Sequence, residues 1–203
     1  MTAAAFPADL PRRDGRTRAF LRAVVVLAGL GLAVGLRWQI FRTAALDGVS
    51  EGLVFGAALV AAAVAGGWRP SRPRAQALMA GVVAGGLLVA ISAASRWPVL
   101  PMTLGHAAPF VPWVLVTGLV ATAEELVLRG SLWRWTAESA GDVAALLLTS
   151  LLFALIHVPV YGWSVVPLDM GVGLIFGGLR LWFGGPAAPA AAHVVADLAT
   201  WWI

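Results

Sequence analysis

The 203-residue sequence contains no cysteine, and all 14 of its basic residues are arginine, so lysine is absent as well. Without cysteine, the chain can form no disulfide, thiolate metal site or cysteine nucleophile. Without lysine it has no Ser/Lys dyad, and it also lacks a Gly-x-Ser-x-Gly motif. The usual sequence patterns of serine and cysteine hydrolases are therefore excluded.

Charge of either sign is scarce. Charged residues make up 12% of the chain and hydrophobic residues 60%, with a mean hydropathy of +0.87. This composition leaves too little polar surface to cover a water-soluble domain of this length. The chain is therefore predicted to be an integral membrane protein.

The net charge of +4 raises the question of nucleic-acid binding. A nucleic-acid interface gathers basic residues on one face, interleaved with aromatic residues. Here the arginines lie between apolar segments, where topology signals of membrane proteins occur. The sequence therefore predicts no nucleic-acid partner.

Seven apolar segments are close to the length of about 20 residues that a membrane-spanning helix needs. They cover residues 23–36, 52–68, 75–94, 110–128, 143–158, 165–183 and 187–203. The predicted fold class is therefore all-α, a polytopic membrane bundle of about seven transmembrane helices in one compact domain.

The N-terminal residues 1–18 mix Pro, Ala, Asp and Arg without periodicity and are predicted to be a disordered basic tail. A secretory signal peptide is the competing interpretation. The first apolar segment is followed by Arg37-Trp38-Gln39 and not by a small-residue cleavage site, which favours an uncleaved first span.

The orientation follows from the arginines, because basic connections are retained in the cytoplasm. With the N-terminus inside, the outer connections hold only Arg37, Arg42 and Arg96. The inner segments hold Arg12, Arg13, Arg16, Arg18, Arg22, Arg69, Arg72, Arg74, Arg134 and Arg180. This asymmetry predicts a cytoplasmic N-terminus and, with seven spans, a C-terminus on the outer side.

Small residues recur at the four-residue spacing that allows close packing of helices in lipid. The pairs are Gly31/Gly35, Gly52/Gly56, Gly81/Gly85 and Gly173/Gly177. They are interpreted as packing contacts, without a function.

Asp169 and Arg180 are interpreted as marking the two ends of the segment 165–183. Six other ionisable residues lie in or directly after the other three of the last four apolar segments, where an unpaired charge costs at least about 2.5 kcal/mol. They are Glu124, Glu125, Arg129, His157, His193 and Asp197. Glu125 and Arg129, like His193 and Asp197, are separated by four residues and therefore share a helix face. The first pair holds one carboxylate ionised and leaves Glu124 to act as a base, and the second pair orients an imidazole.

Each group also has an interpretation without catalysis. The glutamates and Arg129 suit an interfacial ion-pair cluster, His157 suits a helix end, and His193 with Asp197 suits a polar clamp between helices. Depth is a further question, because a straight helix from Val143 puts His157 about 21 Å along its axis. His157 can meet Glu124 only if its helix is tilted or starts deep in the membrane, or if the preceding helix, which carries Glu124, is broken.

Three motifs in this order resemble the CPBP family of intramembrane proteases, which includes CAAX prenyl endopeptidases and lysostaphin-resistance-like and bacteriocin-processing proteins. They are Glu124-Glu125-Leu-Val-Leu-Arg129-Gly130, Phe153-Ala-Leu-Ile-His157 and His193-Val-Val-Ala-Asp197. Asp197 stands where CAAX endopeptidases usually have Asn. The resemblance covers residues 110–203, which are expected to form the catalytic core, with residues 19–109 as accessory helices.

The resemblance implies that Glu124 and His157 activate a water molecule, that His193 and Asp197 stabilise the oxyanion, and that Glu125 and Arg129 support them. It implies as substrate a short peptide or a membrane-anchored protein. A metal-free site is preferred, because no His-Glu-x-x-His helix is present and a zinc ligand at Glu124 would no longer be a base. If zinc were bound, its ligands would be His157, His193 and Glu124.

Two other functions stay open: a non-catalytic membrane module for immunity or assembly, and a small proton-coupled transporter. The arginine-only, alanine-rich composition suggests a bacterial cytoplasmic membrane. Arg134 and Arg180 suggest that a substrate enters from the cytoplasmic side.

Overall fold

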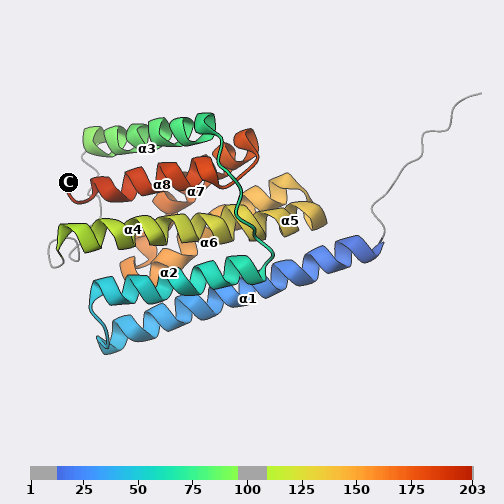
Figure 1. Ribbon diagram of the computed structural model, residues 1–203, viewed down its shortest axis with the longest axis horizontal. Coiled ribbons are helices and arrows are strands. Elements are labelled where there is room, and N and C mark those ends of the chain that lie inside the picture. Colours follow the sequence, from blue (N-terminus) through green and yellow to red (C-terminus); the bar gives the residue numbers. More distant parts are fainter. Residues whose placement is uncertain (1–12, 96–108, 203) are drawn as a thin grey trace, which may run out of the picture.

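A computed structural model describes residues 13–95 and 109–202 of the chain, and within these ranges the regular elements are all helical. Figure 1 shows most of the long helices lying side by side, antiparallel in sequence order. The elements are α1 (Arg13–Thr43), α2 (Gly48–Ala65), α3 (Ala75–Ser95), α4 (Phe110–Glu125), a π-helical segment η1 (Leu126–Leu132), α5 (Trp133–Ala140), α6 (Asp142–Tyr161), a 3₁₀ turn η2 (Trp163–Val165), α7 (Val166–Phe183) and α8 (Ala187–Ala199).

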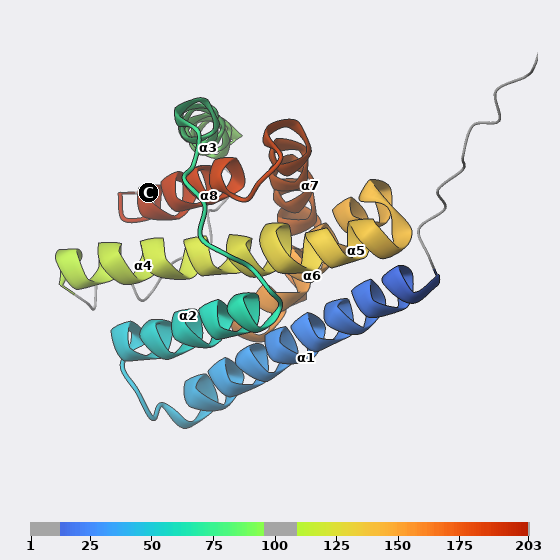
Figure 2. The same cartoon turned by 45° about the vertical axis from the view of Figure 1, so that its right-hand side comes forward.

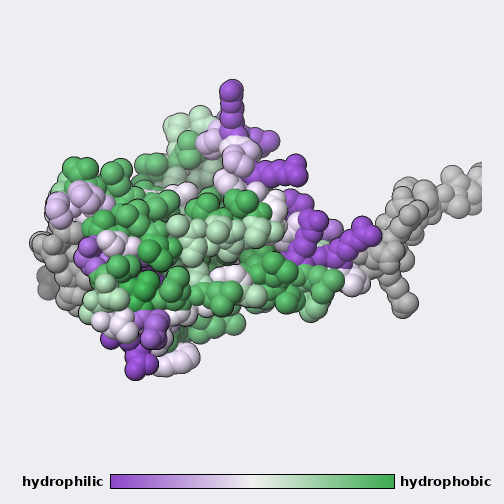
Figure 3. All heavy atoms as spheres, turned by 60° about the horizontal axis from the view of Figure 1, so that its bottom comes forward, coloured by the Kyte–Doolittle hydropathy of each residue, from purple (hydrophilic) through white to green (hydrophobic). Residues whose placement is uncertain are grey.

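Six stretches of the described chain are long and apolar enough to cross a membrane, and α8 is a seventh, shorter apolar helix. Many large hydrophobic side chains on these helices are exposed, as a surface in contact with lipid requires. Figure 3 shows that one face is mostly hydrophobic, with hydrophilic residues in separate groups at its periphery. The predicted fold class, an all-α polytopic membrane bundle, is confirmed.

The first helix begins at Arg13, inside the segment predicted to be a disordered tail. Residues 1–12 lie outside the described residues. At the other end of the chain, α8 ends at Ala199, so the last predicted span is shorter than residues 187–203.

The helix that carries Glu124 is much longer than its predicted span of residues 110–128. It continues through η1 and α5 without a break, so that one 31-residue helix runs from Phe110 to Ala140. Its second half packs on α2, where the Ser131 hydroxyl donates to the Ala63 carbonyl oxygen over 2.9 Å. The polar sequence after Leu128 ended the predicted span, but these tertiary contacts keep the backbone helical.

Three of the four glycine pairs lie at helix contacts. Gly52 and Gly56 face α4, Gly173 and Gly177 face α6, and Gly81 and Gly85 face α8. Gly31 and Gly35 have no atom of another helix within 4 Å of an added Cβ. The packing interpretation is therefore confirmed for three pairs and wrong for the pair on α1.

We expect Gly85→Leu to lower the thermal stability of the protein. An added Cβ at Gly85 would lie 2.5 Å from the Ala192 carbonyl oxygen on α8, the helix that carries His193. Overpacking of this kind typically costs about 1–3 kcal/mol. The measurement is the unfolding temperature in detergent, and Gly86→Leu is the matched control because its added Cβ meets no atom within 4 Å. Equal stabilities of the two variants would contradict the α3–α8 contact.

Candidate active site

Glu124 and Glu125 end α4 at the start of the π-helical segment, and both side chains are buried. A π-helical turn widens the backbone and often occurs at functional sites. Arg129, on this segment, donates from Nη1 to Glu125 Oε1 over 2.8 Å, as the four-residue spacing predicts. Glu124 has no such cationic partner, and its Oε2 atom has no hydrogen bond to any described residue.

Arg129 is fully buried and is held from several sides. Its Nη2 atom donates to the Gly173 carbonyl oxygen over 2.9 Å, and its guanidinium lies over the rings of Phe153 and Phe176 at 5.0 and 5.6 Å. Arg180, which the sequence did not place near the six site residues, donates from Nε to the Arg129 carbonyl oxygen over 2.8 Å. The glutamate-bearing helix is thus fixed to α6 and α7.

His193 on α8 lies among three carboxylates. Its Nδ1 atom is 3.2 Å from Glu125 Oε1, and its Nε2 atom is 3.4 Å from Asp197 Oδ2 and 3.9 Å from Glu124 Oε2. Because an ionised carboxylate only accepts, Glu125 requires the proton on Nδ1. The side of the ring with Nε2 then faces Glu124 and Asp197.

His157 on α6 reaches the same carboxylate from another side. Its Nε2 atom lies 3.9 Å from Glu124 Oε2. Its Nδ1 atom lies 2.8 Å from the Phe153 carbonyl oxygen and 3.3 Å from Asp169 Oδ2. Both of these neighbours accept hydrogen bonds, so Nδ1 carries the proton and Nε2 presents a lone pair towards Glu124.

The length of the glutamate helix explains why Glu124 and His157 meet. Counting from the end at which α5 stops and α6 begins, Glu124 is about 24 Å and His157 about 22 Å along their helices. The depth mismatch inferred from the sequence came from ending the glutamate helix too early. All six predicted site residues belong to one connected cluster.

Asp169 is part of this cluster, although the sequence suggested only that it marks the start of a span. A carboxylate in the first turn of an apolar helix was the signal that could have identified it. Phe153 also belongs, because its ring lies edge-on to both imidazoles, at 4.9 Å from His157 and 5.2 Å from His193.

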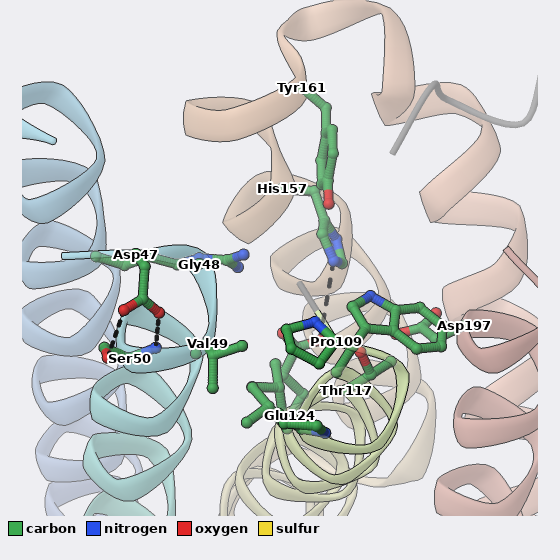
Figure 4. A pocket seen from close by; sticks show the side chains of 16 residues that line it. Asp47, Gly48, Val49, Ser50, Pro109, Thr117, Glu124, His157, Tyr161 and Asp197 are labelled. Atoms are coloured by element: carbon green, nitrogen blue, oxygen red, sulfur yellow. Dashed lines mark hydrogen bonds and ion pairs between the residues drawn. The ribbon is translucent and has the colours of Figure 1, made fainter. Parts of the chain in front are cut away.

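A cavity of about 460 Å³ leads to the cluster and reaches Glu124, His157 and Asp197. Figure 4 shows His157 and Tyr161 pointing from α6 towards the centre of this cavity. Its wall also includes Arg37 of α1, the start of α2 and the first half of α4. The first two helices, which the sequence assigned to an accessory region, thus help to form the wall.

The cavity lies at the end of the bundle opposite to Arg134 and Arg180. Along α4 its lining residues extend from Pro109 to Glu124, whereas Arg134 follows Glu124 on the same continuous helix. The prediction that the entrance lies on the side of these two arginines is wrong for this cavity. By the positive-inside rule the arginines predict on which side of the membrane a connection lies, but they carry no information about which end of the bundle is hollow.

Asp47 forms the N-cap of α2 at the cavity wall, accepting from the Ser50 amide over 2.8 Å (Figure 4). The hydrogen bonds from Ser50 lower the pKa of Asp47 below its ordinary value of 3.8. A carboxylate with a lowered pKa in the folded state stabilises the fold above its unfolded pKa and ceases to do so as the pH falls through the folded value.

We therefore expect the stability contributed by Asp47 to be constant above about pH 5 and to be lost below about pH 4. The difference in unfolding temperature between the wild type and Asp47→Ala should shrink over this interval. Asp47→Asn caps the helix without titrating and serves as the control. A difference that does not change between pH 7 and pH 3 would contradict the role of the ionised cap.

The candidate zinc ligands point at one another, but their donor atoms are widely spaced. Glu124 Oε2 lies 3.9 Å from Nε2 of each histidine, whereas bonds of about 2.0–2.1 Å in a tetrahedral zinc site put ligand atoms about 3.3 Å apart. Within residues 13–95 and 109–202, no group of three or more His, Asp or Glu side chains has the arrangement of a metal site. These residues, as placed, do not fit zinc.

The fold and the site together define a polytopic membrane protein with a buried carboxylate–imidazole cluster at the inner end of a cavity. Residues 106–199 match the family model described as type II CAAX prenyl endopeptidase Rce1-like. This match confirms the resemblance to the CAAX protease family over this part of the chain. Comparison with the curated proteins and with the solved structures gives no match.

Proposed function

We propose that the protein is an intramembrane endopeptidase in which Glu124 and His157 activate a water molecule for attack on a peptide bond. One observation carries this proposal. Glu124 Oε2 lies 3.9 Å from Nε2 of both histidines, at the inner end of a cavity. This separation is too long for a direct hydrogen bond and suits a bridging water molecule.

The protonation pattern of the two activating residues supports this step. A water molecule between them would donate one hydrogen to Glu124 Oε2 and the other to the lone pair of His157 Nε2. Its own lone pairs would then be directed at the substrate carbonyl carbon. Glu124 would accept the proton as the C–O bond forms, which is general-base catalysis within hydrogen-bond reach.

His193 is proposed to stabilise the oxyanion of the tetrahedral intermediate from Nε2. Because Nδ1 is bound to Glu125, this requires the doubly protonated ring, whose charge is balanced by the carboxylates of Glu125 and Asp197. Arg129 in turn neutralises Glu125. A donor held in place before the reaction costs little reorganisation during it.

In the final step the C–N bond breaks and Glu124 returns its proton to the leaving amine. The products are a carboxylic acid and an amine, and one proton then passes between them to give a carboxylate and an ammonium group. One water molecule is consumed and the enzyme is restored. The substrate would be a short peptide or an extended segment of a membrane-anchored protein, because the cavity has an apolar wall that includes Val49, Val116 and Val120.

The test is the cleavage of a quenched fluorescent peptide library by purified protein reconstituted in liposomes. We expect the wild type to cleave a subset of peptides and His157→Ala to lose at least about 10²-fold in rate, because half of the water-activating pair is removed. Undiminished cleavage by His157→Ala would contradict the mechanism.

We also propose that hydrolysis requires no metal, because the candidate ligands are spaced too widely for zinc. Exhaustive chelation should leave the cleavage rate unchanged. A loss of activity that zinc restores, and magnesium does not, would overturn this part of the proposal and indicate that the histidines move closer together in the working enzyme.

A further inference from the structure

The arginines of the described residues are distributed unequally between the two ends of the bundle. One end consists of the start of α1, the α2–α3 connection, the end of α5 and the end of α7. It holds Arg16, Arg18, Arg22, Arg69, Arg72, Arg74, Arg134 and Arg180. Within residues 13–95 and 109–202, the opposite end holds only Arg37 and Arg42. We call the first end the arginine-rich end, and by the positive-inside rule it faces the cytoplasm.

The cavity lies entirely towards the other end. Its lining residues come from the α1–α2 connection and the start of α2, from the start of α4, and from the ends of α6 and α8. In each antiparallel helix these positions lie far from the arginine-rich end. Glu124 and His157, at the inner end of the cavity, are still about 22–24 Å from the arginine-rich end along their helices.

On the side of the cluster towards the arginine-rich end, the described side chains are packed together. There, Arg129 fills the space between Phe153 and Phe176, and Arg180 bonds to the Arg129 backbone. Leu128, Leu132 and Trp133, on the same stretch of helix, are buried. A peptide approaching from the arginine-rich end would have to displace this packed core.

From these observations we infer that the cavity opens to the non-cytoplasmic side of the membrane, so that the substrates are peptide segments presented from that side. That these segments are substrates rests on the proposed proteolytic function. The orientation of the cavity does not depend on that function. Exported peptides and the outer segments of membrane proteins belong to this class. Cytosolic C-terminal tails do not.

The residues that line the cavity indicate which polarity and charge such a segment should have. Val49, Trp113, Val116 and Val120 offer an apolar wall to an extended chain. Arg37 is a cation in the described lining, and its charge is balanced by Glu51, to which Nε donates over 3.0 Å. The remaining charged groups are the carboxylates of Asp47, Glu124 and Asp197. The cavity is therefore expected to favour apolar or basic segments over acidic ones.

The absence of cysteine makes a direct test possible, since each single-cysteine variant carries one labelling site against an unreactive wild type. Ala45→Cys, on the α1–α2 connection, and Val49→Cys, in the cavity wall, report on the cavity end. Ser71→Cys and Ala140→Cys report on the arginine-rich end, and both positions are exposed. Intact cells are treated with a membrane-impermeant maleimide before and after the membrane is opened.

We expect Ala45→Cys and Val49→Cys to be labelled in intact cells, and Ser71→Cys and Ala140→Cys to be labelled only after the membrane is opened. The reverse pattern would overturn the inference, even if the peptides are cleaved as proposed. The expected pattern combined with a complete absence of Glu124-dependent cleavage would support the orientation and refute the proteolytic function. Because Ala45 is exposed, its replacement also serves where Val49→Cys perturbs the cavity.

Discussion

Glu124→Gln should lower the rate of peptide cleavage by about 10²- to 10⁴-fold, the usual contribution of a general base. The amide keeps the size and shape of the side chain but cannot accept the proton of the attacking water. Glu124 Oε2 makes no hydrogen bond to a described residue, so the change removes no hydrogen bond of this atom. The cleavage rate in liposomes and the unfolding temperature should be measured on the same preparation.

Glu138→Gln is the matched control, because Glu138 lies on the same continuous helix and its side chain is exposed. It makes the same chemical change away from the cluster and should leave the cleavage rate unchanged. If Glu124→Gln cleaved as fast as this control, Glu124 could not be the base. If Glu124→Gln also retained the wild-type function in cells, a non-catalytic membrane module would be the better description.

Arg129→Met should be the most destabilising single substitution in the cluster. It removes the guanidinium that neutralises Glu125. The fully buried Glu125 carboxylate then loses the arginine partner on its own helix. Breaking a buried ion pair in this way typically costs about 3–5 kcal/mol. We expect a large fall in the unfolding temperature and loss of protein from the monodisperse peak in size-exclusion chromatography.

The double variant Glu125→Gln with Arg129→Met separates charge from shape. With both charges removed, most of the stability should return, because the desolvation cost of the pair disappears together with its attraction. Arg134→Met, at an exposed position four residues after Gly130, should have little effect on stability. A double variant as unstable as Arg129→Met would show that the contacts of Arg129 with Gly173 and the two phenylalanine rings matter more than its charge.

The sequence by itself determined the environment of the protein and the composition of its site. A chain with 60% hydrophobic residues and seven apolar segments of this length is expected to fold as a helical bundle in lipid. In such a bundle the backbone polar groups form hydrogen bonds within each helix, and the apolar side chains contact lipid. Charged residues inside such segments are costly, and this cost identified the six cluster residues. Their four-residue spacings predicted the Glu125–Arg129 ion pair correctly.

Only the tertiary structure decided how these residues meet and from which side the site is reached. Contacts of Ser131 and Trp135 with α2 extend the glutamate helix to Ala140, and this length brings Glu124 to the depth of His157. Arg37 reaches the cavity from a helix whose local sequence gives no sign of this role, and Asp169 reaches the cluster from the first turn of an apolar helix. Sequence periodicity specifies the faces of a helix. The depth and tilt of each helix, and the position of a cavity, depend on how the side chains of several helices pack against one another.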